Sequence, residues 1–116
     1  MIIISPYSAK LRTGGRNPKN FPNWVQLIAL LRHRRYQTTQ IGVTSEERIS
    51  GVDYFVVDKP FAELKRMASS AELVIAVDNF FPHLCHAEKI KTPVITLFGQ
   101  SDPLIFSYPE HTAMLK

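Results

Sequence analysis

The sequence is poor in the features that mark secreted, membrane and disulfide-linked proteins. A single cysteine, Cys85, excludes an internal disulfide framework and is typical of a reducing compartment. No apolar run approaches the roughly 20 residues that span a bilayer. The start, MIIISPYS, lacks the basic segment of a signal peptide. These absences predict a soluble, cytoplasmic protein without a membrane span.

Several catalytic signatures are also missing. No Gly-x-Gly-x-x-Gly follows the first apolar run, which counts against a dinucleotide cofactor. No Gly-x-Ser-x-Gly and no paired-carboxylate pattern supports hydrolase chemistry. His83 and His86 have no third ligand at a zinc-binding spacing, so we expect no metal and no bound cofactor. We interpret Cys85 as a small buried apolar residue and His86 as a surface residue.

The composition that remains is that of one globular domain. The 116 residues are 45% hydrophobic and 21% charged, which suffices for a core and argues against disorder. We therefore predict a single domain over residues 1–116. The net charge of +4 gives little support for nucleic-acid binding. Four cations, however, fall in the loop 6–23: Lys10, Arg12, Arg16 and Lys19.

Short apolar runs alternate with helical patterns along the chain. We expect strands at 2–4, 38–43, 54–57, 73–77 and 94–98. Helices are expected from Trp24 to the basic run RHRR, from Pro60 over Leu64 to Ala68, and from about Pro82 to Ile90, with Asn23 as the first N-cap. Trp24 fits the apolar stripe of its helix better than a base-stacking role.

This alternation predicts an α/β fold with a Rossmann-like parallel sheet of about five strands, in the order 3-2-1-4-5, and helices on both faces. Because crossovers are right-handed, the winding reverses between the first and fourth strands. Ligands bind such sheets beyond the carboxyl ends of the strands, at that reversal. The loop after Ile4 and the turn at Asp78-Asn79 should therefore face each other.

Two interpretations of these facing segments stay open. With Pro82 at the first helical position, the following amides would be free to bind an anion, and the basic loop would supply cations for phosphate. A diphosphate bridging the two segments is one interpretation. The other is that Asp78 or Asn79 only caps the helix and that the loop charges are solvated.

The pieces ISPYSAK, VDNFFPHL, TPVITLFG and GQSDP occur in the order of corresponding motifs in family 9 glycosyltransferases. Over nearly its whole length the chain resembles the C-terminal, donor-binding half of these heptosyltransferase-like enzymes. The resemblance implies one half of a GT-B fold that binds a nucleotide-diphospho-sugar as the donor substrate. Phe80 stands where the family prefers glycine, and Phe81 and Pro82 also depart from the pattern.

The resemblance also implies roles for individual residues. The donor phosphates would be bound by Lys10, Asp78, Asn79, Phe80, Phe81 and His83. The nucleoside would be bound by Glu46 or Glu47 at the ribose and by Val57 and Asp58 beside the base. The same end of the sheet would be closed by Ser8, Gly99, Ser101 and Asp102. No catalytic residue is nominated, because the family's general base lies in the acceptor-binding half.

Two functions follow as expectations. The first is glycosyl transfer, in which a second domain, a second chain or a homo-oligomer supplies the acceptor-binding half. The alternative is a non-catalytic nucleotide-binding or partner-docking module that keeps the fold. A nucleic-acid binder using the loop 10–19 is a third reading with little support.

Overall fold

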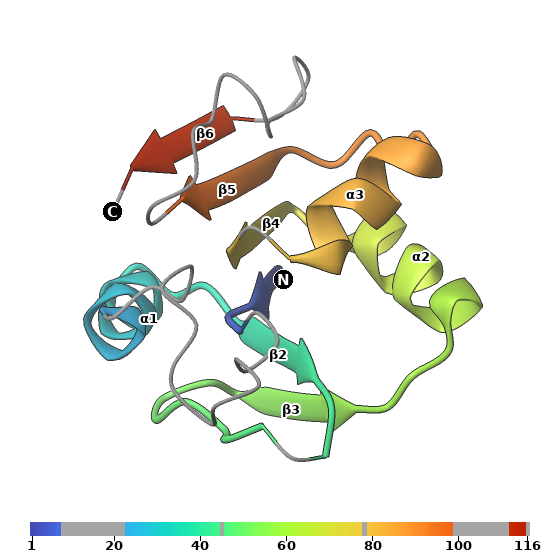
Figure 1. Ribbon diagram of the computed structural model, residues 1–116. Coiled ribbons are helices and arrows are strands. Elements are labelled where there is room, and N and C mark those ends of the chain that lie inside the picture. Colours follow the sequence, from blue (N-terminus) through green and yellow to red (C-terminus); the bar gives the residue numbers. More distant parts are fainter. Residues whose placement is uncertain (8–22, 45, 78, 99–111, 116) are drawn as a thin grey trace, which may run out of the picture.

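The computed structural model describes residues 1–7, 23–44, 46–77, 79–98 and 112–115. A parallel sheet in the order β3-β2-β1-β4-β5-β6 forms its centre (Figure 1). The strands are β1 Ile2–Ser5, β2 Thr38–Gly42, β3 Tyr54–Val57, β4 Leu73–Val77, β5 Val94–Phe98 and β6 Thr112–Leu115. The five predicted strands and their order are confirmed. The edge strand β6 adds a sixth strand beside β5.

Helices cover both faces of the sheet, as predicted. The helix α1 (Trp24–His33) lies on one face, and α2 (Phe61–Ser70) and α3 (Phe80–Ala87) lie on the other (Figure 1). The alternation of side chains along β1 explains this: Ile2 and Ile4 join the core under α1, whereas Ile3 joins the core under α2 and α3. A strand buried on both faces reads as a continuous apolar run.

The connection between β2 and β3 contains no helix among its described residues. Instead, Ile49 and Val52 of this segment are buried in the α1-side core. The fully buried Gln40 of β2 holds the segment, because its Nε2 donates to Glu47 O over 2.8 Å and its Oε1 accepts from Ile49 N over 2.7 Å. Both polar atoms of the buried Gln40 amide are thus hydrogen-bonded to the segment. They hold it against the sheet without a crossover helix.

The start of α3 differs from the prediction. The helix begins at Phe80 with Asn79 as its N-cap, so Pro82 occupies the third helical position and not the first. The reason is that Asn79 accepts a side-chain hydrogen bond from Phe81 N, which fixes an earlier start. Proline fits there because the first helical turn has no intrahelical acceptor for its N–H groups. Asn23 does precede α1, but its side chain makes no capping hydrogen bond.

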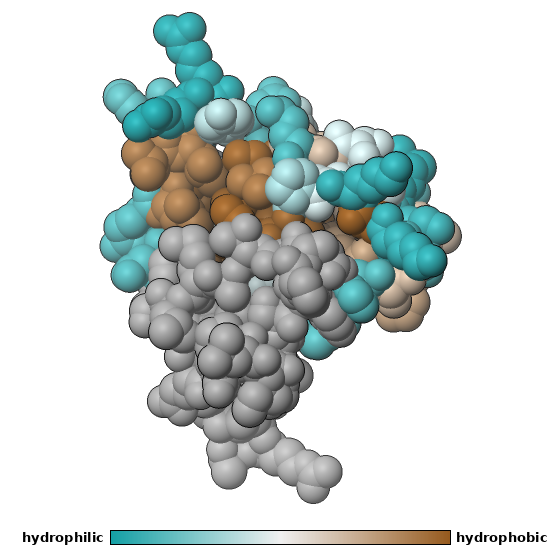
Figure 2. All heavy atoms as spheres, turned by 90° about the horizontal axis from the view of Figure 1, so that it is seen from above, coloured by the Kyte–Doolittle hydropathy of each residue, from teal (hydrophilic) through white to brown (hydrophobic). Residues whose placement is uncertain are grey.

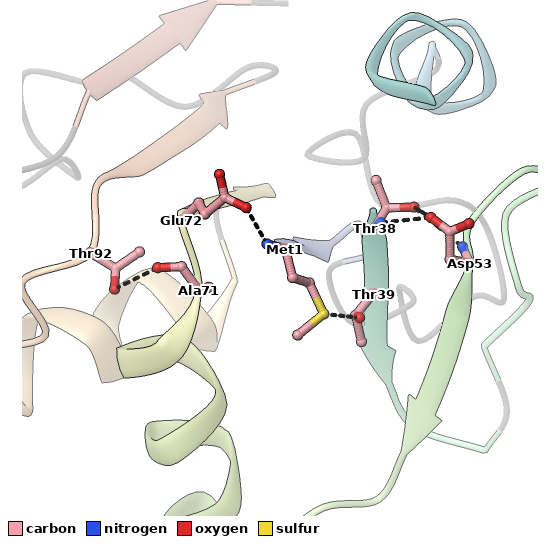
Figure 3. Close-up of polar contacts among 7 residues, drawn as sticks. All are labelled: Met1, Thr38, Thr39, Asp53, Ala71, Glu72 and Thr92. Atoms are coloured by element: carbon pink, nitrogen blue, oxygen red, sulfur yellow. Dashed lines mark hydrogen bonds and ion pairs between the residues drawn. The ribbon is translucent and has the colours of Figure 1, made fainter. Parts of the chain in front are cut away.

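Polar contacts close the amino edge of the sheet (Figure 3). Thr38 N donates to Asp53 Oδ2 over 2.8 Å, and the Thr92 hydroxyl donates to Ala68 O over 2.6 Å. The amino group of Met1 contacts the Glu72 carboxylate in the same region (Figure 3). The polar groups at this edge are paired with one another, so they hold the starts of the strands in place.

On the β6 side of the sheet, Figure 2 shows apolar side chains gathered on one face between hydrophilic ones.

Among the described helices, none is both long and apolar enough to cross a membrane.

Candidate functional site

The side chain of Asn79 joins the two segments that flank the reversal of winding. Its Nδ2 donates to Ser5 Oγ over 2.9 Å and to Tyr7 O over 3.1 Å, with a longer contact to Ser5 O at 3.4 Å. Its Oδ1 accepts from Phe81 N over 2.9 Å. Because β1 and β4 are neighbours in the sheet, one amide therefore ties the segment after β1 to the start of α3. The predicted meeting of these two segments is confirmed.

The first turn of α3 offers fewer free amides than the sequence suggested. The Phe81 N–H is bonded to Asn79, and Pro82 has no N–H to donate. Among the described residues, the Phe80 N–H makes no hydrogen bond like the one that the Phe81 N–H makes to Asn79. An anion approaching the positive end of α3 would therefore meet the Phe80 amide first.

The two phenylalanines of this turn point to different surroundings. Phe81 is fully buried in the core with Leu64 and Cys85, so its ring lies away from the surface of the site. Phe80 is 48% exposed, and its ring lies 6.1 Å from that of Phe61 at the start of α2. The bulk of Phe80, where the resembling family prefers glycine, is therefore directed toward α2.

A group of polar residues follows β2 and β3 at the same carboxyl edge. The half-buried Glu46 accepts a hydrogen bond from Val43 N over 2.9 Å and lies against Gly42. Burial raises the pKa of the Glu46 carboxyl, and the Val43 N–H partly offsets this rise. The Asp58 carboxylate accepts from the backbone N–H and from the hydroxyl of Thr44.

The backbone holds Asp58 in an unusual conformation. Its φ of 55° lies in the left-handed region, which few residues other than glycine adopt and in which aspartate is comparatively frequent. Its N–H donates to Gly42 O over 2.9 Å, which joins the ends of β2 and β3. Glu46 and Asp58 therefore belong to one turn structure, whereas Glu47 is exposed and contributes only its carbonyl, to Gln40.

The other predicted site residues divide into two sets. His83 is exposed on α3 and Val57 is half-buried at the end of β3. The residues Ser8, Lys10, Asp78, Gly99, Ser101 and Asp102 lie outside the described part of the chain. Sequence reasoning missed Ser5 and Gly42. The signal for Ser5 was a polar residue that closes an otherwise apolar strand at the predicted binding edge.

Other predictions about single residues are confirmed. Trp24 is a core residue, 4% exposed, and its Nε1–H donates to Pro6 O over 3.3 Å. Cys85 is buried, and burial raises the pKa of its thiol to about 11. His86 is a surface residue.

The strand order and the arrangement at the carboxyl edge place the chain in a class of fold. It is a Rossmann-like α/β domain with its reversal point between β1 and β4, of the kind found in glycosyltransferases.

The solved structures that share this fold include two glycosyltransferases. One is E. coli heptosyltransferase WaaC with ADP, at a TM-score of 0.78 and 19% identity, covering 98% of this chain and 37% of that one. The other is the iron-containing dodecameric glycosyltransferase TibC from enterotoxigenic E. coli, at a TM-score of 0.77 and 20% identity, covering 96% of this chain and 31% of that one. The chain thus has a heptosyltransferase-like fold, as the resemblance implied, and spans about a third of the length of these structures. No protein-family model and no curated protein matches the sequence.

Proposed function

We propose that the carboxyl edge of the sheet binds the nucleoside diphosphate part of a nucleotide-sugar donor. The observation that carries this proposal is the Asn79 bridge, which holds the segment after β1 against the start of α3 at the reversal point. This is where open α/β sheets bind their ligands. A glycosyltransferase with the same fold has been solved with ADP.

The phosphates would lie at the start of α3. The Phe80 N–H and the positive end of the helix supply a donor and a partial charge, and Lys10 supplies a full charge from the basic loop. Asp78 and His83 flank this turn in the sequence. A diphosphate needs several donors, so the Lys10 loop, with Ser8 beside it, carries much of the binding in this proposal.

The nucleoside would lie over the ends of β2 and β3. A carboxylate after the second strand can accept both ribose hydroxyls, and Glu46 is placed there by its bond to Val43 N. Glu47 is the second candidate at the ribose, and Val57 and Asp58, at the end of β3, would adjoin the base. Gly99, Ser101 and Asp102 follow β5 in the sequence, so in this proposal they would close the site from the β5 side.

Glycosyl transfer would use these groups to stabilise the departing diphosphate electrostatically. The acceptor and the general base would come from an acceptor-binding half, in a second domain, a second chain or another copy of this chain. We expect no metal requirement, because in this proposal the positive charge comes from side chains of the basic loop. A cytoplasmic setting accords with the buried, reduced Cys85.

A second candidate function is nucleotide binding or partner docking without catalysis. The observation that favours it is the scarcity of free amides at α3, since Phe81 N is capped and Pro82 has no N–H. With one amide in place of several, the start of α3 would stabilise a departing diphosphate less than a helix start with all of its amides free.

Isothermal titration calorimetry with nucleoside diphosphates and nucleotide sugars tests the proposal. We expect binding to the parent chain and at least tenfold weaker binding to Lys10→Ala. The matched control is Lys91→Ala, which removes the same charge from an exposed residue just before β5, at the amino edge. Equal losses in both variants would contradict a phosphate role for Lys10. Donor hydrolysis or transfer by the chain with its acceptor half then separates the two candidate functions.

A further inference from the structure

Two phenylalanine rings lie exposed side by side at the carboxyl edge of the sheet. Phe61 is the first residue of α2 and is 66% exposed, and Phe80 is the first residue of α3 and is 48% exposed. Their ring centroids are 6.1 Å apart and their planes are inclined by 34°. The Phe80 ring also packs edge-on against the ring of the buried Phe81, with 5.9 Å between the two ring centroids.

The position of this ring pair relates it to the proposed nucleotide site. The helix α2 follows β3 and α3 follows β4, so both helices begin at the carboxyl edge. In the sheet, β2 and β1 lie between β3 and β4. The contact between Phe61 and Phe80 therefore joins the starts of two helices on the same face of the sheet, one after the Asp58 turn and the other after the Asn79 bridge.

We propose that Phe61 and Phe80 form a platform on which the base of the bound nucleotide stacks. This inference rests on the proposed function, and it assigns the two rings to the nucleobase and not to the sugar. Phe61 lies three residues after Asp58, on the side where the nucleoside is expected, and Phe80 carries the amide that faces the phosphates. A planar base matches an exposed aromatic face, and every base offers such a face.

The platform explains the departure of Phe80 from glycine in the resembling family. A glycine there would give phosphate closer access to the backbone but would supply no ring. With Phe80, phosphate would approach the backbone of this turn less closely, and the Phe80 ring forms an apolar surface together with Phe61. The inference therefore predicts that the base adds to the nucleotide affinity that the phosphates supply.

The test compares ligands with and without a base. Calorimetry uses the diphosphates of adenosine, guanosine, cytidine and uridine, with inorganic pyrophosphate as the ligand that has no base. The variant Phe61→Leu keeps an apolar side chain beside Phe80 but removes the aromatic face. The control, Leu30→Ala, truncates a side chain that is 54% exposed on α1, on the opposite face of the sheet.

We expect Phe61→Leu to weaken the tightest-binding nucleoside diphosphate at least fivefold and to leave pyrophosphate binding unchanged. A second readout is F61W, whose exposed indole should be quenched by the nucleotide but not by pyrophosphate, while Trp24 stays buried. If the parent binds nucleotides and Phe61→Leu binds them equally well, the base does not stack on Phe61 and Phe80. The proposed nucleotide site itself would not be contradicted by that result. An effect only on nucleotide sugars would also overturn the platform. If the parent binds neither nucleotides nor pyrophosphate, the proposed function fails with it.

Discussion

Asn79 and Ser5 are 74 positions apart in the chain, yet Asn79 Nδ2 lies 2.9 Å from Ser5 Oγ. The same side chain caps α3 through Phe81 N. One residue therefore fixes the start of a helix and fastens it to the neighbouring strand end. These contacts lie at the centre of the proposed nucleotide site. Replacing Asn79 therefore tests both the fold and the site.

Asn79→Ala should destabilise the fold and weaken nucleotide binding. The variant loses the cap and the donor contacts to Ser5 and Tyr7, a loss of about 2 kcal/mol in the free energy of unfolding. Urea denaturation measures the stability, and calorimetry at a temperature where the variant is folded measures the affinity. Asn79→Asp keeps the acceptor for Phe81 N but removes the amide donor, so it should keep the helix start and still lose affinity.

The matched control for this prediction is Asn23→Ala. Asn23 occupies the N-cap position of α1 but makes no side-chain capping bond, so its loss should cost less than about 0.5 kcal/mol. Equal destabilisation by Asn23→Ala and Asn79→Ala would show that the Asn79 bridge contributes nothing of its own.

Gly42→Ala should act on nucleotide binding through Glu46. A methyl group at Gly42 would overlap Glu46 Oε1, the end of a flexible side chain, so the carboxylate should move while the fold changes little in stability. We expect severalfold weaker nucleotide binding in Gly42→Ala, and the same value in Glu46→Ala and in the double variant, as a double-mutant cycle measures. Additive losses would mean that Gly42 acts independently of Glu46.

Gln40→Leu should destabilise the protein by about 2–3 kcal/mol. The change removes the partner of Glu47 O in a part-buried contact and the partner of Ile49 N in a buried one. Thermal and urea unfolding measure the effect. Gln26→Leu on the exposed side of α1 is the control and should change stability by less than about 0.5 kcal/mol. A Gln40→Leu chain as stable as the parent would mean that the segment 43–53 needs no anchor.

Cys85 should be inert to thiol reagents in the folded protein and should make stability fall at alkaline pH. Burial raises its pKa to about 11. The unfolded chain loses the thiol proton near pH 8.5 while the folded chain keeps it, so stability is full below that pH. By pH 11 the loss approaches about 3 kcal/mol.

Comparison of the parent with Cys85→Ala isolates this contribution, because other groups titrate in the same range. The difference in unfolding free energy between the two proteins should shrink as pH rises from 8 to 11. A constant difference, or rapid labelling of the native thiol at pH 8, would show that Cys85 is not buried as described.

The sheet was predictable from the sequence because its strands are covered on both faces. Runs such as 2–4 and Leu73–Val77 are typical of such strands, and their alternation with helical patterns favoured a parallel sheet in the order 3-2-1-4-5, which the structure confirms. The position of Asn79 beside β1 followed from that order alone. The edge strand β6 was not predictable, because its four residues follow a tail with no clear periodicity.

The details of the site were harder to predict because they depend on single hydrogen bonds. Proline is common at the first helical position, and this preference suggested a start at Pro82. The cap by Asn79 outweighs it and starts α3 two residues earlier, which removes the Phe81 amide from the site. Likewise, nothing in the polar segment after Gly42 indicated that Gln40 anchors it in place of a helix.

The most direct test of the central claim is a titration of the ¹⁵N-labelled chain with the nucleoside diphosphate that binds it most tightly, followed by amide chemical shifts. We predict that the Phe80 amide shifts downfield as it donates to a phosphate, whereas the Phe81 amide, already bonded to Asn79, moves much less. Residues at the amino edge such as Thr38 and Asp53 should not respond. Shifts confined to the amino edge, or an unchanged Phe80 amide at saturation, would contradict the account.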